Sequence, residues 1–452
     1  MHPTKTLREK YILFFKLFIP ILIYQFANFS ASFIDTLMTG QFSTQDLAGV
    51  SMASSLWNPF FSLLTGIVSA LVPIIGHRLG RGEKAAIREE LHQFLYLACG
   101  LSVFLLLLIY FGAIPALGLF GLEPHVLAVG QQYLSFICLG IFPLLLFSVF
   151  RSFFDALGLT RMSMYLMLLL VPFNSFFNYV LIFGKLGLPR LGGAGAGLGT
   201  SLSYWLLLVV ILVVMQVDER IRAYQIWKWS PINPKLLVDG LRLGLPIGLQ
   251  IFAEVAIFAV VGLLMAKFSS QIIAAHQAAM NFATLMYAFP VSVSMALPIV
   301  ISYELGAKRA QAVRDYTRIG RLVAMGFAGF TLTFLYFFRG QVAGLYGHDA
   351  EFIQTTSNFL TFALFFQLAD AFAAPLQGIL RGYKDTTMPF VIGVGAYWSM
   401  SLPLAFLLGN TTDLGPVAYW IGLIMGIVSC GLLLQLRLKK VARETLTSTR
   451  LT

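Results

Sequence analysis

Apolar stretches of about twenty residues recur along the whole chain, the length that a helix needs to cross a bilayer. They are continuous rather than alternating, which favours helices over a closed β-barrel, the other structure that satisfies every backbone hydrogen bond inside lipid. Charged residues make up 11% of the 452 residues, whereas soluble proteins use roughly 25% to face water. The sequence therefore predicts an all-α integral membrane protein.

The apolar stretches define twelve predicted transmembrane helices. They cover residues 14–39, 47–75, 91–112, 126–150, 162–183, 193–216, 240–266, 273–302, 317–338, 352–378, 388–408 and 415–436. An even number of spans places both termini on the same side of the membrane.

The basic residues are distributed very unevenly between the two sides. The chain has 31 Lys and Arg, and only Lys185, Arg190, Lys267 and Arg339 fall on the side opposite the termini. Positively charged loops stay in the cytoplasm, so both termini of this multi-pass membrane protein are predicted to be cytoplasmic. The net charge of +11 follows from this topology and from contact with anionic lipid, and nucleic acid is not expected as a partner.

The two halves of the sequence resemble each other when the chain is shifted by half its length. Pro20-Ile21 matches Pro246-Ile247, and FSTQDLAG from Phe42 matches FSSQIIAA from Phe268; a slightly shorter shift pairs Gly158 with Gly382. Six spans per half make parallel repeats, a design in which transporters move two lobes around a central site. The predicted division is an N-terminal lobe at 1–216, a cytoplasmic linker at 217–238 and a C-terminal lobe at 239–452.

Three acidic residues, Asp35, Glu254 and Asp370, lie inside predicted spans, and no Lys or Arg is expected deep in any span. Intramembrane acids are costly and mark functional sites. The helix rise of about 1.5 Å per residue places Glu254 and Asp370 near the midplane. Asp35 lies about two turns farther outward in the repeat alignment, so the two lobes differ in where they place their acids.

Asp35 is predicted to have polar neighbours in the outer half of the N-terminal lobe. Asn174 and Asn178 lie one turn apart on span five, and Thr200 lies near the outer end of span six. A carboxylate with amide and hydroxyl oxygens suits a proton or a hard cation such as Na⁺. The alternative is that these polar groups only join helices through hydrogen bonds.

The sequence contains no GxxxxGK[ST] motif, so no ATP site of that type is expected. Energy must come from an ion gradient or from the gradient of the substrate. The six His are scattered, and none is paired with an acid at ligand spacing within a span. An intramembrane enzyme, which needs a nucleophile–base pair or a metal cluster, is therefore disfavoured, and no cofactor is expected.

Three segments resemble the multidrug and toxic compound extrusion (MATE) family in its bacterial NorM-like branch. They are FIDTLMTG ending at Gly40, PIGLQIFAEVAIFAVVGLLMAKFSSQIIAAHQ from Pro246 and ADAFAAPLQGILRGYKDTTMP from Ala369. The resemblance implies a six-plus-six-helix antiporter of the bacterial plasma membrane that exports cationic and amphipathic drugs against Na⁺ or H⁺.

The resemblance also implies roles for the six polar residues. Positions matching Asp35, Asn174, Asn178 and Thr200 form an ion site in the N-terminal lobe, and positions matching Glu254 and Asp370 serve cation coupling and drug binding. With Na⁺ as the coupling ion, the three acids are the expected metal ligands. The choice between Na⁺ and H⁺ stays open.

Three other functions compete with export. A lipid-linked precursor flippase of the same superfamily would place Arg in its cavity to hold pyrophosphate, a membrane enzyme would need the groups named above, and a channel would make poor use of asymmetric acids. The sequence thus predicts a secondary active multidrug exporter that works by alternating access. We expect it to act as a monomer in the bilayer on small organic cations, without ATP or enzymatic activity.

Overall fold

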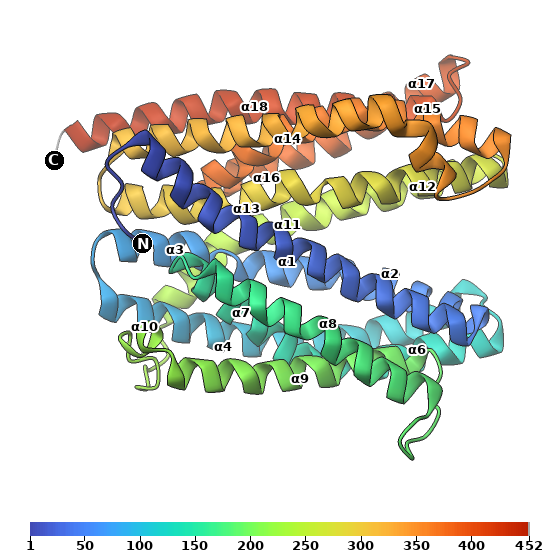
Figure 1. The fold of residues 1–452 in the computed structure, drawn as a ribbon, viewed down its shortest axis with the longest axis horizontal. Helices are drawn as coiled ribbons and strands as arrows, with labels where there is room; N and C mark the ends of the chain where they lie inside the picture. The colour runs from blue at the N-terminus through green and yellow to red at the C-terminus, as the bar shows by residue number, and fades with distance from the viewer. Residues whose placement is uncertain (451–452) are drawn as a thin grey trace. The chain divides into compact units, whose positions relative to one another are not determined.

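The protein is helical throughout the part that the structure describes (Figure 1). This computed structural model describes residues 1–450, and the side chains of all of these except 446, 449 and 450. Eleven helices or near-continuous helix pairs are long and apolar enough to span a membrane, and a twelfth span is formed if α6 and α7, bent by 52°, count as one. The predicted all-α membrane fold is confirmed.

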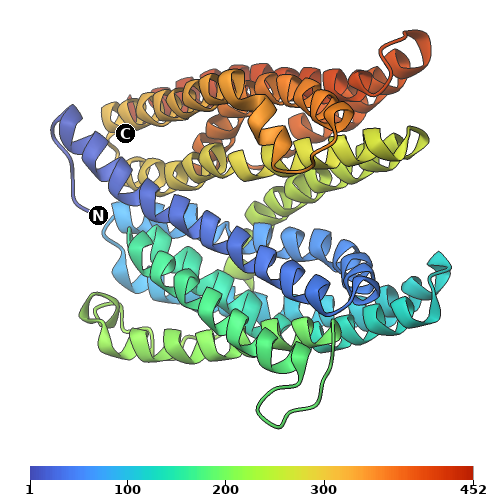
Figure 2. The same ribbon diagram turned by 45° about the vertical axis from the view of Figure 1, so that its right-hand side comes forward.

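The first half of the chain contains ten α-helices and two short irregular helices. They are α1 Leu7–Phe42, α2 Thr44–Val68, α3 Leu71–Gly80, α4 Lys84–Leu108, η1 Ile109–Ala113, α5 Ile114–Leu117, η2 Gly118–Phe120, α6 Pro124–Cys138, α7 Ile141–Ala156, α8 Thr160–Phe183, α9 Ala194–Val217 and α10 Glu219–Arg222. The loop between α8 and α9 extends beyond the helix ends (Figure 2).

The second half repeats this arrangement with longer continuous helices. They are α11 Pro234–Leu264, η3 Met265–Lys267, α12 Ser270–Met286, α13 Ala288–Gly306, α14 Ala310–Gly344, α15 Ala350–Gly382, α16 Thr387–Val394, η4 Gly395–Ser401, α17 Leu402–Thr411 and α18 Val417–Arg450. Seven predicted spans fall inside continuous helical segments of the two halves. The spans predicted at 47–75, 126–150 and 273–302 cross a break of one or two residues between consecutive helices, and those predicted to start at 193 and 415 begin one and two residues before α9 and α18.

The chain forms two compact units, one of residues 23–248 and one of residues 1–22 with 249–452. The boundaries lie in α1 and α11, two residues beyond Pro20 and Pro246. A proline inside a helix removes one backbone hydrogen bond and favours a bend. The first turns of each of these helices therefore belong to the unit formed mainly by the other half, and the lobe boundaries at 216 and 239 stay a prediction.

Helix ends in the first half recur at equivalent positions in the second, half the chain length later. Gly82 and Lys308, which follow α3 and α13, have positive φ angles of 77° and 59°; Gly158 and Lys384, after α7 and α15, have 80° and 61°. A left-handed residue after a helix terminates it by allowing its last carbonyls to be capped. Gly158 is thus the counterpart of Lys384, and its pairing with Gly382 from the sequence is wrong.

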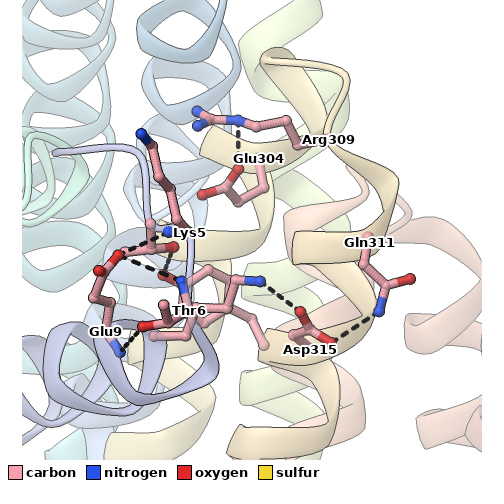
Figure 3. A network of polar contacts seen from close by, with 10 residues as sticks. Lys5, Thr6, Glu9, Glu304, Arg309, Gln311 and Asp315 are labelled. Carbon is pink, nitrogen blue, oxygen red and sulfur yellow. Dashed lines mark hydrogen bonds and ion pairs between the residues drawn. The ribbon is translucent and has the colours of Figure 1, made fainter.

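The N-terminal segment is anchored to α14 in its own unit (Figure 3). Glu9 Oε2 accepts hydrogen bonds from the backbone N–H groups of Lys5 and Thr6, and Thr6 Oγ1 accepts one from Glu9 N–H. This reciprocal pattern is a capping box, which satisfies free donors at a helix start. One turn later the buried Lys10 donates to Asp315 of α14 at 2.5 Å.

The linker between α9 and α11 packs along α4. His92, Gln93 and Tyr96 contact the backbone carbonyls of residues 226, 231 and 230 at 2.6–2.9 Å. At its end Asn233 accepts hydrogen bonds from the first backbone N–H groups of α11, as a helix N-cap does. The linker is therefore held to a helix of its own unit by three side chains.

Candidate functional site

The structure brings Asp35 together with the three polar residues that the sequence grouped around it, Asn174, Asn178 and Thr200. Asn174 Nδ2 donates to Asp35 Oδ1 at 2.6 Å, and Asn178 Nδ2 donates to the same oxygen. Thr200 Oγ1 lies 3.5 Å from Asp35 Oδ2 and 3.3 Å from Asn174 Oδ1. The group joins α1, α8 and α9 within one unit. Asp35 is half-buried, whereas Asn174 and Asn178 are buried.

A close approach of α9 to α8 positions this group. A Cβ atom added at Gly199 would lie 2.3 Å from Asn178 Oδ1 and 3.2 Å from its backbone nitrogen, so only glycine fits. Among the described residues, Asn178 Oδ1 is buried and has no hydrogen-bond partner. A buried acceptor of this kind calls for a ligand or a donor. Together, Asn178 Oδ1 and the Asp35 carboxylate offer oxygen atoms that can bind a metal cation or a proton.

A second site lies in the other unit, around a cavity of about 490 Å³ that Glu254 and Asp370 both line. Glu254 projects from α11 and Asp370 from α15. Glu254 Oε1 accepts from Gln377 Nε2 at 3.3 Å and from Gln250 Nε2 at 3.5 Å, while Asp370 is 9% exposed. Glu254 and Asp370, for which the sequence predicted an equal depth, thus line the same cavity.

Arg381 also lines this cavity, although its backbone lies three residues beyond the predicted span 352–378 and no Lys or Arg was predicted deep inside a span. It lies in the last turn of α15, eleven residues after Asp370 and four after Gln377, on the same face. Side chains tilt toward the N-terminus of their helix, and the long guanidinium therefore reaches back from the helix end into the cavity. The backbone position of Arg381 is local to the sequence, whereas the reach of its side chain into the cavity is not.

Aromatic side chains form much of the remaining wall. Phe258 and Phe366 pack edge to face with centroids 5.8 Å apart, and Tyr287 and Tyr397 also line the cavity. Tyr397 lies on η4, a π-helical turn, a distortion that is frequent at functional sites. Sequence reasoning missed these four residues, because nothing in the pattern separates them from other aromatic residues that face lipid or core.

A further buried polar group was missed near the end of α7. Arg151 donates a hydrogen bond to the phenolic oxygen of Tyr24, and its guanidinium lies 4.9 Å from the Tyr24 ring centroid. Asp155, also on α7, accepts from Ser163 Oγ at 2.7 Å. The partners lie 8 to 127 residues apart in sequence, too far for a local pattern to pair most of them.

One histidine has an acidic partner after all. His125 Nε2 lies 2.7 Å from Oδ1 of the buried Asp46, whose other oxygen accepts from the backbone N–H of Gly193. His125 and Asp46 lie at the starts of α6 and α2. The pair joins the first turns of α6 and α2 and shares no residue with the two acidic sites.

The three intramembrane acids do not form one metal site. Among the described residues, no three His, Cys, Asp or Glu side chains are clustered as metal ligands. Asp35 lies in one unit, whereas Glu254 and Asp370 lie in the other. A Na⁺ bound at either place would have to take most of its ligands from amide, hydroxyl or backbone oxygens.

Up to twelve spans, a tandem repeat and buried acids on a cavity define this protein as a multi-pass membrane transporter. The sequence profile of the MatE family matches it twice, at residues 20–180 and 246–407, once in each half of the repeat. The chain therefore belongs to the MATE family of multidrug efflux transporters.

Relatives of known name cover nearly the whole chain. The probable multidrug resistance protein NorM of Streptococcus pneumoniae (strain ATCC BAA-255 / R6) is 60% identical over 98% of both chains. The protein of the same name from Bacillus subtilis (strain 168) is 43% identical over 98% of both. The Vibrio cholerae MATE transporter VcmN, solved in its bent form, has a TM-score of 0.86 and 19% identity over 97% of this chain and 98% of its own, a likeness of fold. Bacterial relatives of this kind make it a plasma-membrane protein.

Proposed function

We propose that this protein exports cationic or amphipathic organic compounds in exchange for Na⁺ or H⁺, by alternating access. The observation that carries the substrate class is the cavity in which Glu254 and Asp370 face aromatic walls. Carboxylates attract cations strongly in a low-dielectric site, and aromatic faces add cation–π attraction. The names of the bacterial relatives as multidrug resistance proteins support the same class of substrate.

Coupling to the ion is assigned to the Asp35 group. Its carboxylate receives two amide donors, and the neighbouring Asn178 Oδ1 is an acceptor with no described partner. Binding of H⁺ or Na⁺ there would change the charge of the group and so the stability of the α1–α8–α9 contact. A contact whose energy depends on ion occupancy can bias one conformation over another.

Both termini are proposed to be cytoplasmic, on the basis of the basic loops. Each of the two sites is complete within one chain, which supports a monomer as the working unit. Ion and substrate are the only transported partners proposed, with no cofactor and no ATP.

Arg381 requires the flippase alternative to be reconsidered, because the absence of an intramembrane Arg was the argument against it. The cavity holds two carboxylates and one guanidinium. Fully ionised, these groups leave one net negative charge, which favours a monovalent cation over a pyrophosphate. Export of organic cations therefore remains the function that the site supports best.

The test is transport by the purified protein in liposomes, with Na⁺ and H⁺ gradients imposed separately. An ethidium-like cation is expected to move against the ion that couples. Asp35→Asn keeps size and hydrogen bonding but removes the titratable charge, and should abolish gradient-driven export while binding of some drug persists. Asp413→Asn, an exposed acid outside both sites, serves as the matched control and should transport normally.

Two results would contradict the proposal. Transport of anions alone would show that the acidic cavity has been misassigned. A full drug gradient built by the Asp35→Asn protein would place coupling elsewhere, with the Glu254–Asp370 cavity as the next candidate.

A further inference from the structure

We propose that a groove between α14 and α18 binds the headgroup of an anionic phospholipid from the cytoplasmic leaflet. The groove has a volume of about 520 Å³ and lies at the predicted cytoplasmic ends of both helices. It is separate from the cavity that contains Glu254 and Asp370, with which it shares no lining residue. Nothing in the transport proposal uses it.

Cationic side chains from both helices face the groove. Arg314, Arg318 and Arg321 are spaced by four and three residues on α14, which places them on one helix face. Gln435 and Lys439, four residues apart, line the opposite wall on α18. Guanidinium groups bind phosphate oxygens through paired hydrogen bonds, and basic pockets between transmembrane helices at the cytoplasmic side favour anionic lipid headgroups.

The cations of the groove lack an ion-pair partner in the part of the chain that the structure describes. None of the ion pairs among the described side chains includes an arginine that lines the groove or Lys439. Asp315, next to Arg314, pairs with Lys10, and Asp385 pairs with Arg437. Glu444, five residues after Lys439, is exposed and forms no ion pair with the groove cations. Four cations without a carboxylate partner among the described side chains favour an anion from outside the chain as their counter-charge.

Gln435 adds a more specific signal. Its Oε1 atom is buried and has no hydrogen-bond partner in the part of the chain that the structure describes. Such an acceptor requires a hydrogen-bond donor, and an ionised phosphate group has few hydrogen-bond donors. The glycerol hydroxyls of a phosphatidylglycerol headgroup are donors next to a phosphate, so this lipid matches both walls of the groove.

The groove changes from basic to apolar along α14, as a lipid does from headgroup to acyl chain. Leu322 and Met325 continue the lining beyond Arg321 in the direction of the membrane, and they are 51% and 39% exposed. A soluble phosphate compound would leave this apolar part unused. A phospholipid would place its phosphate beside the arginines and its acyl chain along Leu322 and Met325.

Native mass spectrometry of the delipidated, purified protein tests the proposal with defined lipids. Phosphatidylglycerol is expected to bind at least about tenfold more tightly than phosphatidylcholine, whose headgroup carries the same phosphate but no net charge. The triple variant Arg314→Gln, Arg318→Gln, Lys439→Gln should weaken phosphatidylglycerol binding on the order of 100-fold, at about fivefold per charge removed.

The matched control removes three other cations of the same predicted side, by Lys84→Gln, Arg161→Gln and Arg222→Gln, all exposed and outside the groove. It should change the affinity by no more than about twofold, because distant surface charges are screened. Should the groove triple variant fail to fold in thermal unfolding or size-exclusion measurements, the single exposed Arg314→Gln variant replaces it, with about a fivefold loss expected.

Three outcomes would overturn the assignment. An equal loss of phosphatidylglycerol affinity in both triple variants would mean that only the net charge of the protein matters. Phosphatidylcholine binding as tight as that of phosphatidylglycerol would mean that the arginines do not select an anionic headgroup. Binding of soluble glycerol 3-phosphate as tightly as the lipid would identify a site for a free phosphate compound. All readouts measure binding, so they are independent of whether transport occurs as proposed.

Discussion

At the scale of single residues, hydrogen-bond geometry rather than acidity alone distinguishes the two candidate sites. Asp35 is held by amide donors from a neighbouring helix, whereas Glu254 is held by two glutamines on a cavity that also contains Arg381. The first arrangement is a compact set of side chains joined over 2.6–3.5 Å, with oxygen atoms that suit a small ion. The second is open and can take an organic molecule.

Gly199→Ala tests whether the tight arrangement matters. The added methyl group would displace the Asn178 amide, which donates to Asp35, and loss of a hydrogen bond to a charged group costs about 1.5–3 kcal/mol. Gradient-driven transport should fall on the order of tenfold or more in the liposome assay. Gly100→Ala, at a helical glycine with open space around it, should leave transport unchanged. Equal activity of both variants would show that this packing is not used.

Neutralising the acids of the cavity should lower substrate affinity rather than coupling. Glu254→Gln and Asp370→Asn each remove one negative charge that faces a bound cation. At the effective dielectric of a partly wet site the attraction lost amounts to about 1–4 kcal/mol, so the Kd for an organic cation should rise about tenfold or more. Fluorescence titration of the purified protein measures it. Unchanged affinity in both variants would remove the cavity from the substrate pathway.

Arg381 should act in the opposite sense. Arg381→Gln removes the cation that competes for the carboxylates of the cavity, and is expected to tighten binding of a monovalent organic cation several-fold in the same titration. Arg381→Lys keeps the charge and is the matched control, with affinity near the original. Weaker binding in Arg381→Gln alone would instead make the guanidinium a direct ligand of the substrate.

At the scale of elements, the two halves share their helix ends but not their charges. Arg78 pairs with Glu83 after α3, while the equivalent positions of the second half hold the reversed pair of Glu304 and Arg309 after α13. Each pair bridges a helix end and the turn that follows it. The repeat therefore keeps an ion pair between these two positions, while the acidic and the basic residue exchange places.

The anchoring of the first turns of α1 is also an element-scale property. Lys10 and Asp315 have side chains that are 7% and 23% exposed, so removing either partner leaves a poorly solvated charge. Exposed ion pairs contribute less to stability than buried pairs lose when one partner is removed, and this pair lies between the two cases. We therefore expect Lys10→Ala or Asp315→Ala to lower the free energy of unfolding by about 1–3 kcal/mol.

Thermal unfolding in detergent measures this pair through a double-mutant cycle, in which Lys10→Ala, Asp315→Ala is compared with the single variants. A coupling energy well above the error of the cycle is expected, because the partners are in direct contact. Strictly additive effects of the two substitutions would mean that the pair contributes nothing to anchoring α1.

At the scale of the whole molecule, sidedness follows from the charge of the loops. Single cysteines placed in a protein lacking Cys99, Cys138 and Cys430 report it with a membrane-impermeant thiol reagent. Labelling from outside intact cells should reach a cysteine at Lys185 and miss one at Lys308. Labelling at position 308 from outside would invert the proposed orientation.

The sequence by itself determined the membrane class, the number and order of spans and the repeat, because hydropathy and repeated motifs are local properties of the chain. It also grouped Asp35 with Asn174, Asn178 and Thr200, since helix periodicity and direction place side chains along a span. Only the tertiary structure showed that Arg381 reaches the cavity of Glu254 and Asp370, and that aromatic residues of several helices line it. These features depend on side-chain reach and on contacts between segments far apart in the chain, neither of which is a local property of the sequence.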